Sequence, residues 1–317
     1  MTKQLRPLML GIVGDSAAGK TTISSGISQI IGDEDVTAIC LDDYHKYDRL
    51  RRKEVGISAL HPDCNYVDIM EQHVNLLRLG QPILKPVYNH DNGMLERPEY
   101  VKPKKLVIVE GLLCLLTPAL QRSLDITVYL DPDERLRRSW KVTRDTAKRS
   151  YTQEQVLASL LKRTNDSEQF IHPQKKAADL IVRFWPPYGY FDDTVDNAQL
   201  NIRLFQRHSL PRLDLREELE HARNGEKTVL RQEKDVWSGG QPVDILDIDG
   251  TISHEKAEEL AGVIWDHLAI SGHARPKVLG DFSEGKIKRH SEPLALTQLM
   301  ITSYLLKVRE HRPVETD

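Results

Sequence analysis

The chain has 317 residues, with 44 lysines and arginines against 47 aspartates and glutamates, so its formal net charge is -3. This near balance excludes the strongly basic field typical of nucleic-acid-binding proteins. No apolar stretch approaches the roughly 20 residues needed to cross a bilayer. We therefore expect a cytoplasmic protein without nucleic-acid or membrane partners. The three cysteines, Cys40, Cys64 and Cys114, form no metal-binding spacing and are expected to be reduced thiols.

The first predicted elements are a buried strand over residues 8–13 and a helix over 21–31. The loop between them reads Gly-x-x-x-x-Gly-Lys-Thr, a pattern of loops that hold nucleotide phosphates through backbone N–H groups and a helix N-terminus. Lys20 is expected to reach the β- and γ-phosphates of ATP, and Thr21 to bind Mg²⁺. The predicted nucleotide-binding residues are Gly14, Asp15, Ser16, Ala17, Ala18, Gly19, Lys20, Thr21 and Thr22.

The next predicted strand covers residues 36–41 and ends at two carboxylates, Asp42 and Asp43. Close to a γ-phosphate, one of them can accept the proton of an attacking hydroxyl and the other can hold Mg²⁺. His45 and Arg49 follow and offer donors to an anionic acceptor. The alternative is a plain polar turn in which Asp42 is only a cap.

Asp68 is then expected to cap a helix that ends near Gly80. A strand over 106–109 ends at Glu110, which can enter the Mg²⁺ coordination shell. A further strand over 126–130 precedes a charged helix over 133–148. That helix carries a basic stripe, which is either a solvated face or a lid that brings cations to a transferring phosphoryl group. The stripe consists of Arg137, Lys141, Arg144 and Lys148, and Asp145 and Arg149 follow.

The remaining elements continue the alternation of strands and helices. Strands are predicted over 180–184, 200–205 and 243–248, and helices after Thr152, after Ser253 and over 294–309, the last being amphipathic. Residues 207–234 carry many charges of both signs and are expected on a solvated surface. This order predicts an α/β fold with a mainly parallel, mixed sheet and helices on both faces. Ligands are expected at the carboxyl ends of its strands.

Several motifs resemble one enzyme family. They are Leu41-Asp-Asp-Tyr-His45, Arg52-Lys53-Glu54, Ala59-Leu60-His61-Pro62, Lys85-Pro-Val-Tyr-Asn-His-Asp-Asn-Gly93, Val109-Glu-Gly-Leu112, Trp140-Lys-Val-Thr-Arg-Asp145 and Phe170-Ile-His-Pro-Gln-Lys175. Together they resemble the phosphoribulokinases, in particular the plant, cyanobacterial and archaeal branch. The resemblance implies a phosphate-loop kinase that uses ATP and Mg²⁺ to convert ribulose 5-phosphate to ribulose 1,5-bisphosphate. We expect one such domain over residues 1–317, with its core in 1–190 and further strands and helices in 191–317, in a homodimer.

The resemblance also implies roles for individual residues. Asp42 lines up with the catalytic base, and Glu110 with an acid that binds metal together with Thr21. The expected sugar-phosphate contacts are His45, Arg49, Tyr88 and His90, and the basic lid is Lys141, Arg144, Asp145 and Arg149, with Arg163 as a further basic residue. Catalysis is thus assigned to Asp42, Lys20, Glu110, Arg144 and Asp145.

Two alternatives stay open from the sequence. A uridine or cytidine kinase has a similar phosphate loop, although Tyr88-Asn89-His90 fits a sugar phosphate better. A nucleotide-dependent regulatory protein is the other alternative, but the guanine-reading Asn-Lys-x-Asp motif is absent. The light-regulated plant phosphoribulokinases carry a cysteine within the phosphate loop, where this chain has Ala18. In those enzymes the loop cysteine can pair with a second cysteine before the Asp-Asp motif, where this chain has Cys40. Because Ala18 cannot form that disulfide, we expect no control through it.

Overall fold

The computed structural model describes residues 6–149, 151–187, 195–224, 227–237, 240–268, 275–276 and 278–311. The chain divides into two compact units. The first comprises residues 1–24, 33–130 and 137–178, and the second comprises 25–32, 131–136 and 179–317. The expected boundary at residue 190 lies outside the described residues. Among the described residues, no helix is both long enough and apolar enough to cross a membrane.

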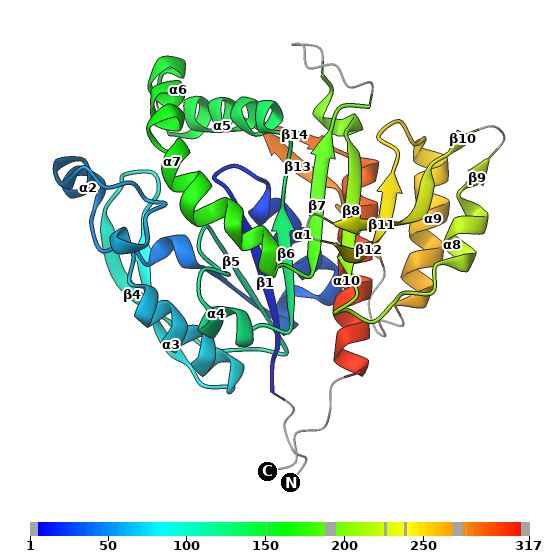
Figure 1. Cartoon of the computed structure of the whole chain (residues 1–317), viewed down its shortest axis with the longest axis horizontal. Coiled ribbons are helices and arrows are strands. Elements are labelled where there is room, and N and C mark those ends of the chain that lie inside the picture. The colour runs from blue at the N-terminus through cyan, green and yellow to red at the C-terminus, as the bar shows by residue number, and fades with distance from the viewer. Residues whose placement is uncertain are drawn as a thin grey trace, which may run out of the picture. The chain divides into compact units, whose positions relative to one another are not determined.

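Four parallel strands form the centre of the first unit, in the order β6-β1-β5-β2 (Figure 1). They are β1 (Leu8–Gly14), β2 (Val36–Cys40), β5 (Leu106–Gly111) and β6 (Ile126–Leu130). Every side chain of β1 and β6 is buried, which accounts for their continuous apolar sequences. The strands predicted for this region are confirmed. Their parallel pairing brings the ends of β1, β2 and β5 to one edge, with Cys40 opposite Glu110 and Val13 opposite Gly111.

Helices alternate with these strands along residues 20–166. They are α1 (Lys20–Ile31), α2 (Arg49–Val55), α3 (Val67–Arg78), α4 (Pro118–Arg122), α5 (Glu134–Lys148), α6 (Gln153–Lys162) and α7 (Thr164–Asp166). Thr152 caps α6 through a capping box, as its sequence predicts. The prediction that Asp68 caps α3 is wrong. The helix begins earlier because the N–H of Tyr66 donates to the carbonyl of Tyr44, which holds the chain before Val67.

An antiparallel hairpin that the sequence analysis did not predict also belongs to the first unit. It consists of β3 (Ile83–Tyr88) and β4 (Leu95–Val101), and its register shifts between Lys85 and Val87. Both strands contain a proline, and β4 exposes nearly all of its side chains. These features hide the alternation by which strands are recognised.

Four antiparallel strands form the sheet of the second unit, in the order β11-β12-β8-β7. They are β7 (Leu180–Trp185), β8 (Asn201–Arg207), β11 (Leu230–Trp237) and β12 (Gln241–Ile248). The unit also contains β9 (Arg223–Asn224), β10 (Lys227–Thr228), β13 (Asp281–Glu284), β14 (Ile287–His290), α8 (Arg216–His221), α9 (His254–His267) and α10 (Glu292–Glu310). The antiparallel strands account for the mixed character expected of the sheet.

The charged segment 207–234 lies partly on a solvated surface, as expected, since its residues 231–234 are exposed. It also contains the start of β11, which the sequence did not predict and which pairs with β12. Because β11 is an edge strand, charges replace the apolar pattern of a buried strand there. The expectation for the last helix is wrong. Helix α10 is not amphipathic, because nearly every residue from Pro293 to Leu306 is buried, and it packs against α9, β8 and β12. Its buried Thr297 and Thr302 hydroxyls donate to carbonyls of the helix itself.

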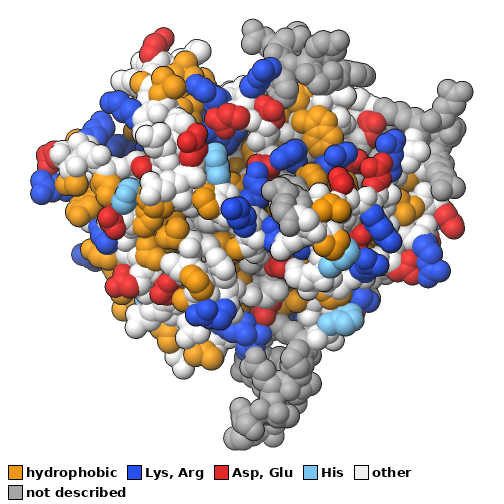
Figure 2. Space-filling model, in the orientation of Figure 1, with side chains coloured by type: hydrophobic (Ala, Val, Ile, Leu, Met, Phe, Trp, Pro, Cys, Tyr) orange, Lys and Arg blue, Asp and Glu red, His pale blue; other side chains and the backbone are white. Residues whose placement is uncertain are grey.

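The surface carries charges of both signs. Figure 2 shows Lys and Arg side chains interspersed with Asp and Glu over the visible face. This mixing agrees with the nearly balanced formal charge of the chain.

Candidate active site

The loop between β1 and α1 folds around its own lysine. Lys20 Nζ donates to the carbonyl oxygens of Gly14 at 3.0 Å and Asp15 at 3.3 Å, and its side chain is buried. Ala17 and Gly19 adopt left-handed backbone conformations, with φ of 69° and 94°. Such a conformation strains an alanine, and strained residues of this kind concentrate at ligand-binding loops. An inward lysine and a strained loop at a helix N-terminus fit a bound phosphate chain.

Glu110 at the end of β5 meets the first turn of α1. Its two carboxylate oxygens accept hydrogen bonds from Thr21 Oγ1 at 2.9 Å and Ser24 Oγ at 3.2 Å. Burial raises the pKa of Glu110, and the Asp42 carboxylate adds to the rise, while Lys20 and the Thr21 hydroxyl oppose it. Hydroxyl and carboxylate oxygens are the donors that Mg²⁺ prefers, so Thr21 and Glu110 fit this ion. When bound, Mg²⁺ supplies neutralisation of phosphate charge.

Asp42 is held by the neighbouring strand and not by its own turn. It lies in the short 3₁₀ turn Leu41–Asp43 after β2, and its Oδ1 accepts the N–H of Leu112 at 2.7 Å. The hydrogen bond that its carboxylate accepts therefore comes from a residue outside the turn. Asp43 instead anchors the β3–β4 hairpin, because it pairs with the buried Lys85 Nζ at 2.5 Å. The two adjacent acids are therefore held by different elements.

Three aromatic rings from two segments pack beside Asp43. His45 contacts Tyr88 edge-on with ring centroids 4.7 Å apart, and Tyr88 contacts His90 at 5.0 Å. Burial, with Arg52 nearby, lowers the pKa of His45 to about 4. The neutral ring places Nδ1 2.7 Å from Asn65 Oδ1, while the Asn65 amide donates to two backbone carbonyls. This arrangement makes Nδ1 the donor and leaves Nε2 as an acceptor.

Two arginines of α2 flank this ring cluster. Arg49 donates to the carbonyls of His90 at 2.5 Å and Asp91 at 3.1 Å, and a side chain at Gly93 would collide with it. Arg52 Nη2 donates to the Tyr88 hydroxyl at 2.9 Å, and its guanidinium lies 5.2 Å from the Tyr88 ring. Among the described residues, its buried Nη1 has no hydrogen-bond partner, although the weakly accepting Cys64 thiol lies nearby.

One face of helix α5 contacts the phosphate loop at Ser16. Arg137 donates to the Ser16 carbonyl at 2.9 Å, and Lys141 and Arg144 reach the Ser16 hydroxyl at 3.2 and 3.3 Å. Arg137 and Lys141 are buried, so the solvated-face alternative is wrong for them, whereas Lys148 is exposed and lies outside the cluster. These contacts bring three cations of the stripe to the loop that the sequence assigns to phosphates.

Asp145 organises the cations at the end of α5. It pairs with Lys141 at 2.9 Å, with Arg144 at 2.8 Å and with Arg149 at 3.5 Å. Although burial acts to raise it, Arg144 and Lys141 hold the pKa of Asp145 below its usual value. Burial lowers the pKa of Arg163, and the charge of Arg52 lowers it further. Arg163, at the end of α6, is also one of the charges that lower the pKa of Lys141 on α5, after burial and Arg144, so it couples electrostatically to cations of both α2 and α5.

Sequence reasoning missed three residues of this site. Arg52 belongs to the Arg52-Lys53-Glu54 motif, but no function was predicted for it because the short helix α2 was not predicted. Ser24 lies one helical turn after Thr21, and that spacing is a signal that could have identified it. Gln174 is buried, accepts the N–H of Leu115 and donates to the carbonyl of Leu112, so it supports the turn after β5. No local pattern marks a glutamine for that contact.

The fold and this site define a phosphate-loop kinase. A sequence model described as the Phosphoribulokinase / Uridine kinase family matches residues 9–188. The chain is 34% identical to a phosphoribulokinase of Synechocystis sp., over 99% of this chain and 98% of that protein. The chain therefore belongs to the phosphoribulokinase / uridine kinase family.

Two further comparisons show how far the similarity extends. A uridine kinase of Latilactobacillus sakei is 32% identical, but the alignment covers only 57% of this chain and 88% of that protein. The solved structure of a phosphoribulokinase from Rhodobacter spheroides aligns with a TM-score of 0.58, at 16% identity, and covers 83% of this chain and 98% of that one. At that identity the structural match supports the fold.

Proposed function

We propose that this chain phosphorylates D-ribulose 5-phosphate with ATP and produces ribulose 1,5-bisphosphate. The observation that carries the proposal is the buried Arg52 Nη1, which lies near the neutral His45 and has no hydrogen-bond partner among the described residues, with only the weakly accepting Cys64 thiol nearby. A buried guanidinium donor without an acceptor favours an anionic ligand. Full-length similarity to a phosphoribulokinase supports the same acceptor.

In this proposal, Asp42 is the general base for the acceptor hydroxyl. The N–H of Leu112 fixes one of its carboxylate oxygens, which limits rotation of the carboxylate. Such positioning makes proton transfer effective. Lys20 inside the phosphate loop and Lys141 and Arg144 beside it stabilise the charge that develops during transfer. Asp145 keeps Lys141 and Arg144 in place and acts as a positioning residue.

In the proposed acceptor site, neutral groups contact the sugar hydroxyls and charged groups contact the 5-phosphate. His45 Nε2 is an acceptor, so it suits a sugar hydroxyl and not a phosphate. Arg52, Arg149 and Arg163 supply cations for the 5-phosphate, while Arg49 holds segment 89–93 through two carbonyls. A nucleoside would leave this positive charge unpaired, which favours a sugar phosphate over uridine.

A substrate panel tests the proposal. Purified protein with MgATP is given ribulose 5-phosphate, uridine, cytidine or no acceptor, and ADP release is measured while ³¹P NMR identifies the product. We expect rapid release only with ribulose 5-phosphate and two phosphomonoester signals in its product. Faster release with uridine or cytidine would assign the nucleoside alternative. Equal release without any acceptor would instead support a nucleotide-dependent regulatory protein.

Two expectations go with this proposal. The homodimer is checked by size-exclusion chromatography with light scattering, where twice the chain mass of 36.3 kDa is expected. The need for Mg²⁺ is checked by chelation, which should abolish ADP release and be reversed by added Mg²⁺.

A further inference from the structure

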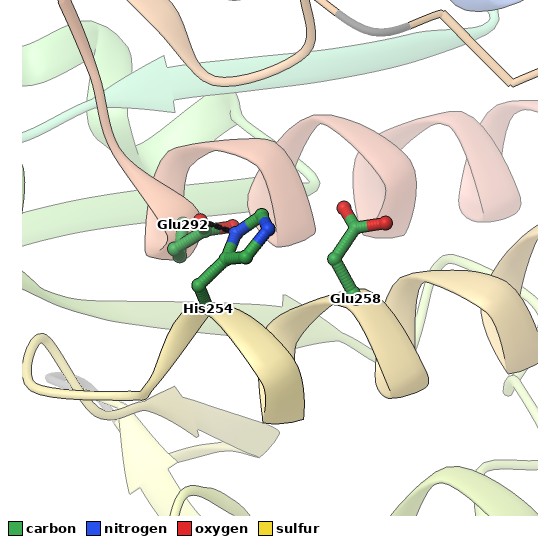
Figure 3. Close-up of side chains that lie close together, drawn as sticks. All are labelled: His254, Glu258 and Glu292. Atoms are coloured by element: carbon green, nitrogen blue, oxygen red, sulfur yellow. Dashed lines mark hydrogen bonds and ion pairs between the residues drawn. The ribbon is translucent and has the colours of Figure 1, made fainter.

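We propose that the second unit carries a binding site for a divalent transition-metal ion, formed by His254, Glu258 and Glu292. One ligand atom from each of these side chains lies within 4.8 Å of the other two. Figure 3 shows His254 and Glu258 on successive turns of α9, with Glu292 at the start of α10 beside the imidazole. None of the three belongs to the candidate active site.

The local structure brings these side chains together before any ion binds. His254 and Glu258 are four residues apart on a helix, so they project from the same face. His254 Nδ1 lies 2.6 Å from Glu292 Oε1, which joins residues 38 positions apart. The His254 side chain is 77% exposed, whereas that of Glu292 is 16% exposed. An ion can therefore reach the imidazole directly from solvent.

A second layer of side chains orients Glu292. His290 Nε2 lies 3.3 Å from Glu292 Oε1, and His290 Nδ1 lies 3.0 Å from Asp281 Oδ1. Carboxylate–histidine contacts of this kind fix the direction of metal-binding groups, and their loss typically weakens metal affinity by about 10–100-fold. Asp281 and His290 come from the β13–β14 hairpin, directly before α10. They are therefore expected to support the site without binding the ion.

A neighbouring arginine already contacts one of the three proposed ligands. Arg275 forms an ion pair with Glu258 Oε2 and also donates to the Glu258 backbone carbonyl at 3.3 Å. A metal ion that uses this carboxylate must share it with Arg275 or displace it. Removal of Arg275 should therefore tighten metal binding, whereas removal of a true ligand should weaken it. This opposite sign separates a metal site from an ordinary surface ion-pair cluster.

The ligand set selects the kind of ion. One imidazole and two carboxylates suit Zn²⁺ and related transition metals, whereas Mg²⁺ prefers oxygen ligands alone. Ligand atoms around tetrahedral Zn²⁺ lie about 3.4 Å apart, given metal–ligand distances of about 2.1 Å. Ligand atoms now within 4.8 Å of one another would adjust to that spacing when an ion binds. Bound metal would link α9 to α10, so we expect it to stabilise the folded protein and leave phosphoryl transfer unchanged.

Metal titration of the full-length protein tests the proposal. Zn²⁺ is titrated into the protein in excess Mg²⁺ while isothermal titration calorimetry measures the heat of binding. Co²⁺ is titrated separately while its visible absorption is followed. We expect one Zn²⁺ per chain at this site and a higher melting temperature. His254→Ala and Glu292→Gln should each weaken binding more than tenfold, and His290→Ala by about tenfold. Arg275→Ala should tighten binding.

Matched controls make the outcome decisive. Glu255 lies on the same helix and His311 is another exposed histidine. Neither Glu255→Gln nor His311→Ala should change the affinity for Zn²⁺. Unchanged melting temperatures of the metal-free variants would show that they fold. No saturable Zn²⁺ binding, or binding that His254→Ala and Glu292→Gln leave intact, would overturn the proposal. Kinase activity in Mg²⁺ is measured in parallel, so a failure of this site is distinguishable from a failure of the proposed function.

Discussion

Thr21 Oγ1 lies 2.9 Å from Glu110 Oε1, although 89 positions separate the two residues in the chain. Parallel pairing of β1 with β5 places the glutamate beside the first turn of α1. Buried parallel strands thus carry a hydroxyl and a carboxylate to one point, where both fit Mg²⁺. The proposed chemistry depends on this pairing, and the following predictions probe the residues around it.

Replacement of Asp42 should remove the general base. Asp42→Asn keeps the shape of the side chain and its contact with the N–H of Leu112, so we expect MgATP binding to persist while kcat falls by about 10²-fold or more. Steady-state kinetics and a nucleotide-binding assay check this result. The exposed Asp63→Asn is the matched control and should keep normal turnover. A near-normal kcat in Asp42→Asn would show that another group accepts the proton.

Lys20 and Arg49 should affect different substrates. Lys20→Ala removes the cation enclosed by the phosphate loop, so the apparent KM for MgATP should rise and kcat should fall. Arg49→Ala frees segment 89–93, so the main effect should be a higher KM for the sugar phosphate. Kinetics with each substrate varied in turn would separate the effects, with exposed Lys53→Ala as the control. An Arg49 variant impaired only toward ATP contradicts this division.

Arg52 should be needed for its fork of donors and not only for its charge. Arg52→Lys cannot both donate to the Tyr88 hydroxyl and present a second donor at the position of Nη1. We expect the KM for ribulose 5-phosphate to rise about tenfold, the cost of one charged hydrogen bond, while the KM for MgATP stays the same. The neighbouring Arg51→Lys, on the exposed side of α2, controls for general charge effects. If both variants had the same KM for ribulose 5-phosphate, Arg52 would not bind the acceptor.

His45 should make the folded state sensitive to acid. Burial lowers its pKa from 6.5 to about 4, so the unfolded chain binds the proton more readily between these values. Stability from the neutral ring is complete above pH 6.5 and is lost as the pH falls toward 4, by up to about 3 kcal/mol. Urea unfolding of the wild type and His45→Gln across this range measures the difference. Parallel profiles for the two proteins would show that His45 is not protected from protonation in the fold.

Oxidation should not switch the enzyme through an internal disulfide. Cys40, Cys64 and Cys114 are free, and Ala18 occupies the buried loop position where the light-regulated plant members have a cysteine. Burial, with the Asp42 and Glu110 carboxylates nearby, raises the pKa of the Cys40 thiol well above its ordinary value and makes it unreactive. Activity should therefore be the same after incubation with oxidised or reduced dithiol. Reversible inactivation that persists in Cys40→Ser, with a Cys64–Cys114 bridge in mass spectra, would contradict this expectation.

The sequence alone determined the features that depend on neighbouring residues. The phosphate loop, the buried strands, the Thr152 and Ser253 caps and the acids at the ends of β2 and β5 all have local signatures, and the structure contains each of them. Periodic burial and capping act within one or two turns of chain, so a linear pattern carries them. The resemblance in the motifs also led to the right family.

Only the tertiary structure decided which side chains meet and in what state. The hydrogen bond from Leu112 to Asp42 and the contact of Lys141 with Ser16 join distant segments, and packing buries Arg52 Nη1 without a hydrogen-bond partner among the described residues. Burial then changes the chemistry, since it makes His45 a neutral acceptor where the sequence suggested a donor to an anion. Desolvation and long-range pairing depend on the packed fold, and no local pattern encodes them.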